Sequence, residues 1–523
     1  AKFRGLRSIH INADGALQVT GGVGNIALTS ANDLIVNGNS SQNEISVTGT
    51  GTITASAAGQ TQMTANANIV SAGGAISITT DRADINESTS TVNAGAGRVT
   101  LKPTATGRAI NLGTTGAADL TKLELTNAEL ARITAGVLEI GSTDVAGAIN
   151  VAGAVTLDNA KVPTLHLKTS AGVSGADSIV VTNLAVEARA AVTLDNANND
   201  VAKLAIYTTT GDVTYKDATG VVVTGVDGVS GVRTDSGRIS LSGNSAGDML
   251  TLDAGNQIAA SGKVTLTFDK MVIDTGVTTA ITAGAASAVE LHTIDANTKI
   301  DLGSTTDNAA NTLELSNAEL NRTTAPGGLE IRAISTAVDS INLSAAVTLD
   351  SDNVGALHLT TSGGIRGGTQ QVTVSSLAMT SGAGGIGTST DPILVNTANT
   401  TLAATAADGD IWITEADGAT VGSVTVDGET VTGITTTGTG GSIHLTLTNG
   451  SLAVNQPITA AGAATVVTLD VNGAGGDDDV TLNADVTASG QIDVRASRDI
   501  LQPSDSVYLI APNVARGANV DLA

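Results

Sequence analysis

The sequence predicts an all-β protein whose strands stack as a parallel β-helix, in which the chain winds through one coil after another. Short stretches rich in Val, Ile and Thr alternate along the whole chain with turns of Gly, Asn and Asp, which is the pattern of short strands. The 523 residues include only one Trp, three Tyr and two Phe, so the interior has to be thin and built from small aliphatic side chains. A long block also occurs twice, as expected of a repeat architecture.

The start of the chain sets the spacing of the strands. The first expected strands are 9–11, 17–19, 26–28, 34–36, 45–47 and 53–55, and comparable ones follow at 264–268, 411–413, 443–447, 480–482 and 492–494. They recur about every nine residues, so two or three of them complete a coil of roughly 18–28 residues. With about 4.8 Å between stacked strands, roughly 20–28 such coils give an elongated rod on the order of 100–135 Å long.

Helical periodicity is not sustained anywhere, but two single helical turns are expected. Thr126-Asn-Ala-Glu129 and Ser316-Asn-Ala-Glu319 both match the capping box, in which a hydroxyl and a carboxylate satisfy the first free amides of a helix. A leucine follows each box, and a glycine ends each turn within a few residues.

The block that occurs twice contains these turns. Leu123-Glu-Leu-Thr-Asn-Ala-Glu-Leu130 returns as Leu313-Glu-Leu-Ser-Asn-Ala-Glu-Leu320, and the phrases Ala-Val-Thr-Leu-Asp and Leu-His-Leu follow in both copies. The copies span about residues 106–190 and 296–383, with an offset of about 190. The strand-and-turn pattern surrounds both of them, so we expect one continuous solenoid over residues 1–523.

Composition excludes several classes of function. The chain has 25 Lys and Arg against 50 Asp and Glu, a net charge of −25, so it lacks the clustered cations that a nucleic acid or an anionic membrane surface requires. It contains no run of about 18 apolar residues that could insert into a membrane. The absence of cysteine excludes disulfides and thiolate metal sites.

The repeated phrases resemble the shafts of large bacterial surface proteins, the filamentous-haemagglutinin-like adhesins that are secreted by the two-partner route. The resemblance implies a right-handed β-helical fibre, secreted and displayed on the bacterial cell surface. The secretion domain of that family carries Asn-Pro-Asn motifs, and this sequence contains none, so the resemblance leaves the export route open. The chain also begins with Ala rather than Met, which fits a processed chain or a fragment of a longer parent.

No catalytic or cofactor-binding residues are predicted. The histidines at 10, 166, 292, 358 and 444 stand among apolar strand residues, so their side chains are expected to point outward into solvent. Asp477, Asp478 and Asp479 follow a glycine-rich turn that loosely resembles a calcium-binding repeat, and calcium is the one candidate cofactor.

The two ends differ in charge. Lys2, Arg4 and Arg7 make the start basic, whereas Asp505 and Asp521 belong to an acidic end. We therefore expect these residues to stack copies of the chain end to end, or the chain to continue into a longer parent.

The function expected from the sequence is mechanical: a non-enzymatic, extracellular rod that serves as an adhesin shaft, a surface fibre or a filament subunit. Its expected partners are copies of itself, a longer parent chain and host or cell-surface glycans. Two alternatives stay open. One is a polymerising filament or surface-layer subunit as the sole role, and the other is a polysaccharide lyase or hydrolase, since such enzymes also use parallel β-helices.

Overall fold

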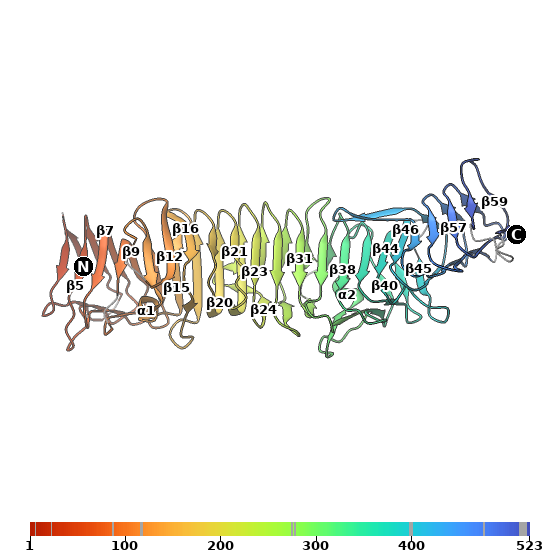
Figure 1. Ribbon diagram of the computed structural model, residues 1–523. Coiled ribbons are helices and arrows are strands. Elements are labelled where there is room, and N and C mark those ends of the chain that lie inside the picture. Colours follow the sequence, from red (N-terminus) through yellow and green to blue (C-terminus); the bar gives the residue numbers. More distant parts are fainter. Residues whose placement is uncertain are drawn as a thin grey trace. The chain divides into compact units, whose positions relative to one another are not determined.

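The computed structural model describes residues 1–523 except 6, 22, 86–87, 116–118, 274–275, 277–278, 397–400, 474–475, 512–519 and 523. The chain forms two compact units: unit 1 comprises Ala1–Asn244 and Leu252–Ile258, and unit 2 comprises Ser245–Thr251 and Ala259–Ala523. Each is built almost wholly from short parallel strands stacked coil upon coil (Figure 1). The predicted parallel β-helix is confirmed. Among the described residues, no helix has the length and hydropathy to span a bilayer.

Three parallel ladders run through unit 1. The first is β1 (Lys2–Gly5), β4 (Ile26–Ser30), β7 (Ile53–Met63), β9 (Ile76–Asp84), β11 (Arg98–Lys102), β15 (Val137–Ser142), β18 (Thr164–Thr169), β20 (Ile179–Ala188), β22 (Asp200–Thr208) and β27 (Val232–Thr234). The second is β12 (Arg108–Thr114), β16 (Ala146–Val151), β19 (Val173–Gly175), β21 (Val192–Leu194), β23 (Val213–Lys216) and β28 (Ile239–Ser242). The third is β3 (Leu17–Val19), β6 (Ile45–Val47), β8 (Asn68–Ser71), β10 (Thr91–Asn93) and β14 (Ile133–Thr134). The pairs β2 (Ile9–Ile11) with β5 (Leu34–Val36), β17 (Val155–Thr156) with β20, and β24 (Gly220–Val223) with β22 extend the first ladder.

Unit 2 repeats this construction. Its first ladder is β31 (Val264–Thr267), β34 (Val289–His292), β38 (Leu329–Ala333), β41 (Leu357–Thr361), β44 (Ser376–Ser381), β46 (Thr401–Ala406), β51 (Ile434–Thr436), β54 (Ile458–Ala460), β57 (Val486–Ala488) and β60 (Leu509–Ile510). The second ladder is β35 (Lys299–Leu302), β39 (Ile341–Leu343) and β42 (Ile365–Arg366). The third is β40 (Val347–Thr348), β43 (Gln371–Thr373), β45 (Ile393–Asn396), β47 (Ile411–Glu415), β52 (Ile443–Leu447), β55 (Val466–Val471), β58 (Gln491–Ala496) and β61 (Val520–Leu522). The fourth is β48 (Ala419–Val421), β53 (Leu452–Val454), β56 (Val480–Leu482) and β59 (Ile500–Leu501). β29 (Met249–Leu252) and β30 (Ile258–Ala260) contain residues of both units. β32 (Lys270–Ile273), β33 (Ile281–Thr282) and β37 (Thr323–Thr324) belong to unit 2.

The register between coils gives their length. Ile53 lies opposite Ile76, and Leu165 lies opposite Leu184, so these coils fall within the predicted range of lengths. Two coils are considerably longer, because Val99 lies opposite Leu138 and Val289 lies opposite Leu329. Each of these longer coils contains one of the predicted helical turns.

Alternation along each strand places one set of side chains inside the coil, where equivalent positions stack in rows. Leu138, Leu165, Leu184 and Leu204 form one such row on consecutive strands, and each of them is fully buried. Stacking like side chains at like positions fills the interior with Leu, Ile and Val and leaves little room for larger groups. Of the few aromatic residues, only Tyr215 and Phe268 are completely enclosed.

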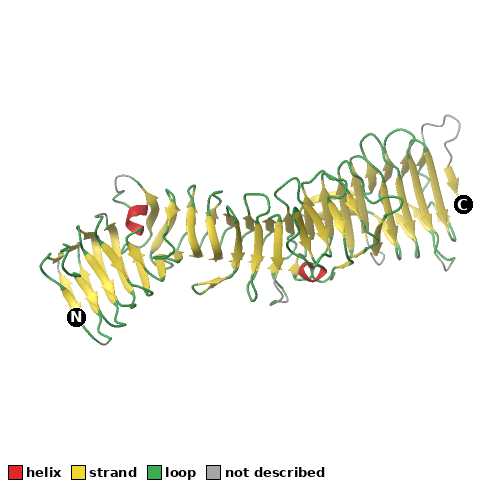
Figure 2. Ribbon diagram, turned by 90° about the horizontal axis from the view of Figure 1, so that it is seen from below, coloured by secondary structure: helices red, strands yellow, loops and turns green. Residues whose placement is uncertain are grey.

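The helical turns α1 (Asn127–Leu130) and α2 (Asn317–Leu320) have the predicted capping boxes (Figure 2). In both copies a short loop brings the next strand into parallel pairing with the one before it: β13 (Leu123–Thr126) pairs with β12, and β36 (Thr312–Leu315) pairs with β35. Each cap carboxylate also reaches another coil, because Glu129 Oε1 accepts the Ile85 amide at 2.9 Å and Glu319 Oε1 accepts the Ile273 amide at 3.0 Å. The carbonyl groups of these two isoleucines accept hydrogen bonds from Arg132 and Arg322, at 2.7 and 2.6 Å. The duplicated phrase thus encodes a helical turn that fastens one coil to another.

We expect Glu319→Ala to lower the free energy of unfolding by about 2–6 kcal/mol, because it leaves the amides of Ser316 and Ile273 without their acceptor at about 1–3 kcal/mol each. Chemical denaturation gives the loss, and hydrogen exchange at the Ile273 amide localises it. Glu129→Ala should have the same effect at Ile85, whereas Asp352→Ala, in an exposed turn, should have none. Unchanged exchange at Ile273 would show that the carboxylate does not hold the coil.

Candidate functional site

Two antiparallel β-hairpins stand out from the parallel ladders of the described chain. In unit 1, β25 (Gly225–Val226) pairs with β26 (Val229–Ser230), and in unit 2, β49 (Ser423–Val426) pairs with β50 (Glu429–Thr432). Both turn at an Asp-Gly pair with positive φ, 45° and 87° in the first and 50° and 80° in the second. Asp-Gly is favoured in such two-residue turns because Asp tolerates and Gly readily adopts positive φ.

Each hairpin lies over the outward face of the first ladder of its unit. Along that face the register aligns a row of residues, here called the outer row. In unit 1 it is Thr100, Glu139, His166, Ala185 and Ala205. In unit 2 it is Thr265, Glu290, Glu330, His358, Ala378 and Ala403. The alanines lie beneath the hairpins, where they pack against Val226 and Val229 in unit 1 and against Val424, Val426 and Val431 in unit 2.

In unit 1 the tip of the hairpin reaches the polar half of the outer row. Asp227 Oδ1 accepts a hydrogen bond from Arg98 Nη2 at 2.6 Å, and its Oδ2 lies 2.6 Å from His166 Nδ1. Arg98 also donates to Glu139 at 3.0 Å. Burial disfavours the charged carboxylate of Asp227, but the hydrogen bonds from Arg98 and His166 outweigh it and hold its pKa below the usual value. The hairpin is thereby fastened to two strands of the sheet, β11 through Arg98 and β18 through His166.

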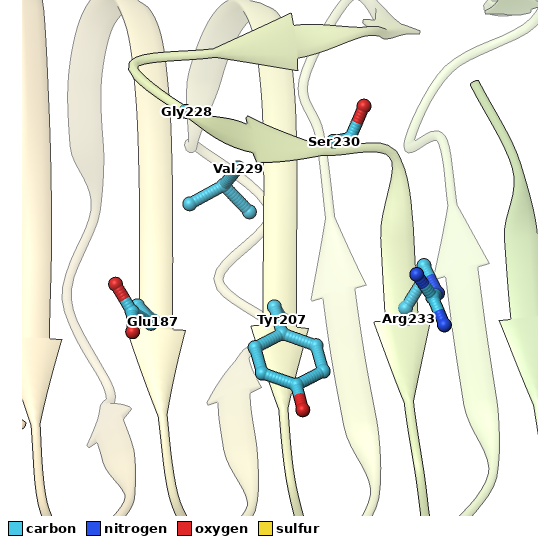
Figure 3. Close-up of a pocket in the computed structure, with 6 residues that line it drawn as sticks. All are labelled: Glu187, Tyr207, Gly228, Val229, Ser230 and Arg233. Carbon is cyan, nitrogen blue, oxygen red and sulfur yellow. The ribbon is translucent and has the colours of Figure 1, made fainter. Parts of the chain in front are cut away.

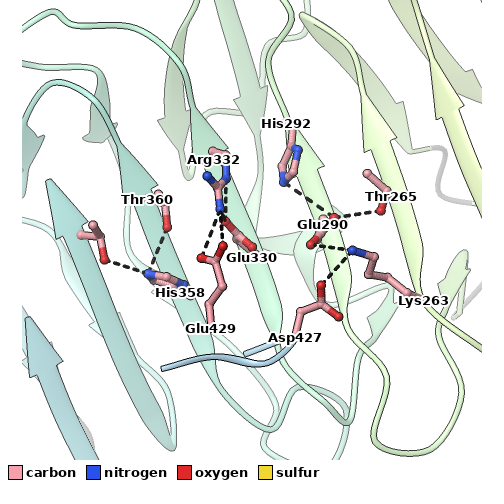
Figure 4. A network of polar contacts seen from close by, with 11 residues as sticks. Lys263, Thr265, Glu290, His292, Glu330, Arg332, His358, Thr360, Asp427 and Glu429 are labelled. Atoms are coloured by element: carbon pink, nitrogen blue, oxygen red, sulfur yellow. Dashed lines mark hydrogen bonds and ion pairs between the residues drawn. The ribbon is translucent and has the colours of Figure 1, made fainter. Parts of the chain in front are cut away.

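Unit 2 has the same arrangement with more charges (Figure 4). Lys263 Nζ donates to Glu290 Oε1 at 3.0 Å and to Asp427 Oδ2 at 2.8 Å. Arg332 donates from Nε to Glu330 Oε1 at 2.7 Å and from Nη2 to Glu429 Oε2 at 3.2 Å. One cation thus joins the turn residue Asp427 to the sheet, and another joins Glu429, the first residue after the turn.

The histidines of the outer rows are not surface residues, and the sequence-based expectation is wrong for them. His166 and His358 point away from the coil interior, as predicted, but the hairpins cover that face and leave them only 3% and 2% exposed. His292 is half-buried. Burial lowers the pKa of His166, although Asp227 favours its charged form, and burial lowers the pKa of His292 and His358 to about 4. The imidazoles of His292 and His358 are therefore neutral at pH 7.

His10 and His444 behave differently. His10 is exposed on β2, as expected. His444 on β52 stacks on Trp412 of the adjacent strand β47, with ring centroids 3.6 Å apart, and burial lowers its pKa.

Three groups of side chains bring a histidine nitrogen and two carboxylates together, with the ligand atoms of each group within 4.8 Å of one another. They are Glu139, His166 and Asp227; Glu290, His292 and Glu330; and Glu330, His358 and Glu429. Imidazole and carboxylate are the ligands of zinc and similar divalent ions. Each group contains two residues of an outer row; the third is a hairpin-turn residue or the residue after that turn in two groups, and His292 in the other.

The site residues expected from the sequence lie elsewhere and are not brought into these groups. Asp477, Asp478 and Asp479 precede β56, and part of the glycine-rich turn before them lies outside the described residues. Arg498 holds Asp479 through both carboxylate oxygens, with Nε 2.8 Å from Oδ1, so this carboxylate already has a cationic partner. Lys2, Arg4, Arg7 and Asp505 are exposed, and Asp521 lies on β61 opposite Asp493.

A shallow cavity of about 310 Å³ lies beside the first hairpin (Figure 3). Glu187, Tyr207 and Arg233 line it from the strands, and Gly228, Val229 and Ser230 line it from the hairpin. Glu187 is paired with Lys168 at 3.1 Å, and the Tyr207 hydroxyl donates to Asp235 at 2.7 Å. The cavity thus has one lining carboxylate, whose partner is a lysine of the adjacent strand.

Two signals in the sequence could have indicated the hairpins. Val-Asp-Gly occurs at 226–228 and again at 426–428, each time within a strand pattern that is interrupted by a tight turn. Each outer-row residue stands at the centre of a triplet that begins with Leu or Val, such as Leu-Glu-Ile, Leu-His-Leu or Leu-Ala-Met. Along each row the central residue changes from Thr, Glu or His to Ala. An outward alanine on consecutive strands indicates that something packs on that face.

No protein family, curated protein or solved structure matches this chain.

We expect Ala403→Leu to lift the second hairpin, because the larger side chain occupies the space in which Val424, Val426 and Val431 pack. Overpacking of this kind costs about 1–3 kcal/mol. Faster hydrogen exchange in β49 and β50 would report it. Ala453→Leu, at the outward and partly exposed position of β53, is the matched control and should leave exchange unchanged. Equal protection of the hairpin in both variants would contradict packing on Ala403.

We expect the stability of the chain to rise with pH between about 4 and 6.5. His292 and His358 have folded-state pKa values near 4 against 6.5 when unperturbed, so the unfolded chain binds more protons in this window and is favoured as the pH falls. Such a shift corresponds to up to about 3 kcal/mol for each imidazole. Urea midpoints at pH 4.5, 5.5 and 6.5 measure the rise.

The double variant His292→Gln/His358→Gln should flatten this rise, whereas His10→Gln, at an exposed position, should retain it. Burial also raises the pKa of Glu330, which titrates with the opposite sign, so the comparison of the variants isolates the imidazole contribution. A double variant with the full pH dependence would assign it to other groups.

Proposed function

We propose that this chain is a non-enzymatic structural protein of the cell exterior, serving as the shaft of a surface fibre or adhesin. The observation that carries the proposal is the unbroken series of parallel ladders in each unit, with stacked aliphatic rows inside. In such a solenoid every coil is held by its neighbours, so stability accumulates with the number of coils and does not require one thick core. A shaft needs stability that accumulates along its length in this way.

The polar features of the described chain also support a structural role. The duplicated phrase that resembles adhesin shafts encodes the helical turn whose Glu and Arg hold the backbone of another coil. The ion pairs of the outer rows hold the hairpins to the sheets. These side chains are engaged in fastening the fold, which leaves ligand recognition to other parts of a larger assembly.

The cavity beside the first hairpin gives no specific support to the carbohydrate-active alternative. Hydrolysis of a glycosidic bond by the common mechanism uses two carboxyl groups that flank the bond. The cavity beside the first hairpin presents only Glu187, which is already paired with Lys168.

Electron microscopy of the native cells, with antibodies raised against this chain, tests the proposal. We expect label along fibres that project from the cell surface. Label confined to the cell interior, or to isolated particles in the medium, would overturn it.

The same preparation separates the alternatives. Purified chain that assembles into regular filaments or sheets by itself would favour the polymer as the sole role. Release of oligosaccharides from acidic polysaccharides that is lost in Glu187→Gln would favour the enzyme instead.

A further inference from the structure

We propose that Glu330, His358 and Glu429 bind a divalent transition metal ion of the zinc class, which staples the second hairpin to the sheet of unit 2. Glu330 and His358 belong to adjacent strands of the outer row, and Glu429 is the hairpin residue that follows the Asp-Gly turn. The inference goes beyond the structural role proposed above and does not depend on it.

The burial of the three residues is that of a site with one open side. Glu330 is 1% exposed and His358 is 2% exposed, whereas the side chain of Glu429 is 58% exposed. The ligand atoms lie within 4.8 Å of one another. Since zinc binds nitrogen and oxygen at about 2.0–2.2 Å, its ligands stand roughly 3–3.5 Å apart, and the exposed Glu429 can move by the difference.

His358 carries the strongest indication of a ligand. Its Nε2 lies 3.0 Å from the hydroxyl groups of both Thr360 and Thr380, while its buried Nδ1 has no hydrogen-bond partner. When Nε2 carries the proton and donates it to a threonine, Nδ1 presents its lone pair to the site. Metal-binding histidines are held in this manner, with the second ring nitrogen donating to a neighbouring acceptor. Figure 4 shows the unpartnered side of the ring turned toward Glu429.

The charges around the site also favour a cation. Four carboxylates, those of Glu290, Glu330, Asp427 and Glu429, share two cationic partners, Lys263 and Arg332. The imidazoles add no charge when neutral, so the cluster has a formal charge of −2. A divalent ion balances it. Arg332 bridges the two carboxylate ligands, so it competes with the metal for them.

The two other groups are less suited to a metal. In unit 1, His166 Nδ1 is already 2.6 Å from Asp227 Oδ2, so a direct hydrogen bond takes the place that an ion would hold. In the group of Glu290 and His292, the carboxylate of Glu290 accepts from Lys263 at one oxygen and from Thr265 at the other. Unit 1 therefore provides an internal control.

Calorimetric titration of the full chain with Zn²⁺, after treatment with a chelator and dialysis, tests the proposal. We expect saturable binding that His358→Gln weakens by more than about 100-fold, since loss of a ligand exceeds the 10–100-fold effect of an outer-shell change. His166→Gln, the equivalent change in unit 1, should leave this binding unchanged. Co²⁺ in place of Zn²⁺ should give a visible d–d absorption band that His358→Gln abolishes.

Arg332→Gln distinguishes a metal site from a purely structural ion pair. Removal of the competing guanidinium should tighten Zn²⁺ binding and let the metal restore slow hydrogen exchange in β49 and β50. If the cluster were held by ion pairs alone, Arg332→Gln would speed hydrogen exchange in β49 and β50 whether or not Zn²⁺ is present. Absence of saturable binding, or equal loss in His166→Gln and His358→Gln, would overturn the proposal.

Discussion

Parallel backbone pairing between consecutive coils is the constraint on which the rest of this structure depends. Because each strand pairs in register with the strand one coil away, equivalent positions are brought to the usual spacing of paired strands, whatever their side chains. Inside the coils this register builds rows such as Leu138, Leu165, Leu184 and Leu204. Outside, it builds rows of whatever the outward positions carry. A single mechanism thus produces both the core and the candidate sites.

The outer rows show what happens when something covers the outward face. Where the hairpins lie, the row contains alanine, which lets a second layer approach the sheet closely. Next to the alanines, the row contains Glu and His, which meet the charged turns of the hairpins. Burying such groups is costly unless they are paired, and here Arg98, Lys263 and Arg332 pair with the carboxylates. The buried polar groups therefore fix where the tip of each hairpin sits.

The fold could be predicted from the sequence because it depends on local patterns. Alternation and turn residues indicated the strands, and the capping boxes indicated both helical turns with the correct residues. The clusters could not be predicted, because Glu330, His358 and Glu429 are far apart in the sequence and meet only through the coil register and the hairpin. Period-2 alternation gives the direction of a side chain but not what lies above it. The histidines were accordingly predicted to point outward, which is correct, and to be solvated, which is wrong for His166 and His358.

The two hairpins are attached to their sheets in the same way, but the side chains that meet at the attachment differ. Both use an Asp-Gly turn, a basic residue before the first Val-Thr-Leu of the sheet, and an outer row that passes from Thr through Glu and His to Ala. In unit 1 the turn aspartate contacts Nδ1 of His166 directly, and it is Nε2 of that ring that is buried without a hydrogen-bond partner. Unit 2 has one additional glutamate in its outer row, so His358 lies one strand further from Lys263, beside Glu429. That single added coil separates the histidine from the turn aspartate and leaves its Nδ1 facing carboxylates without a hydrogen bond, which is the arrangement that a bound cation would complete.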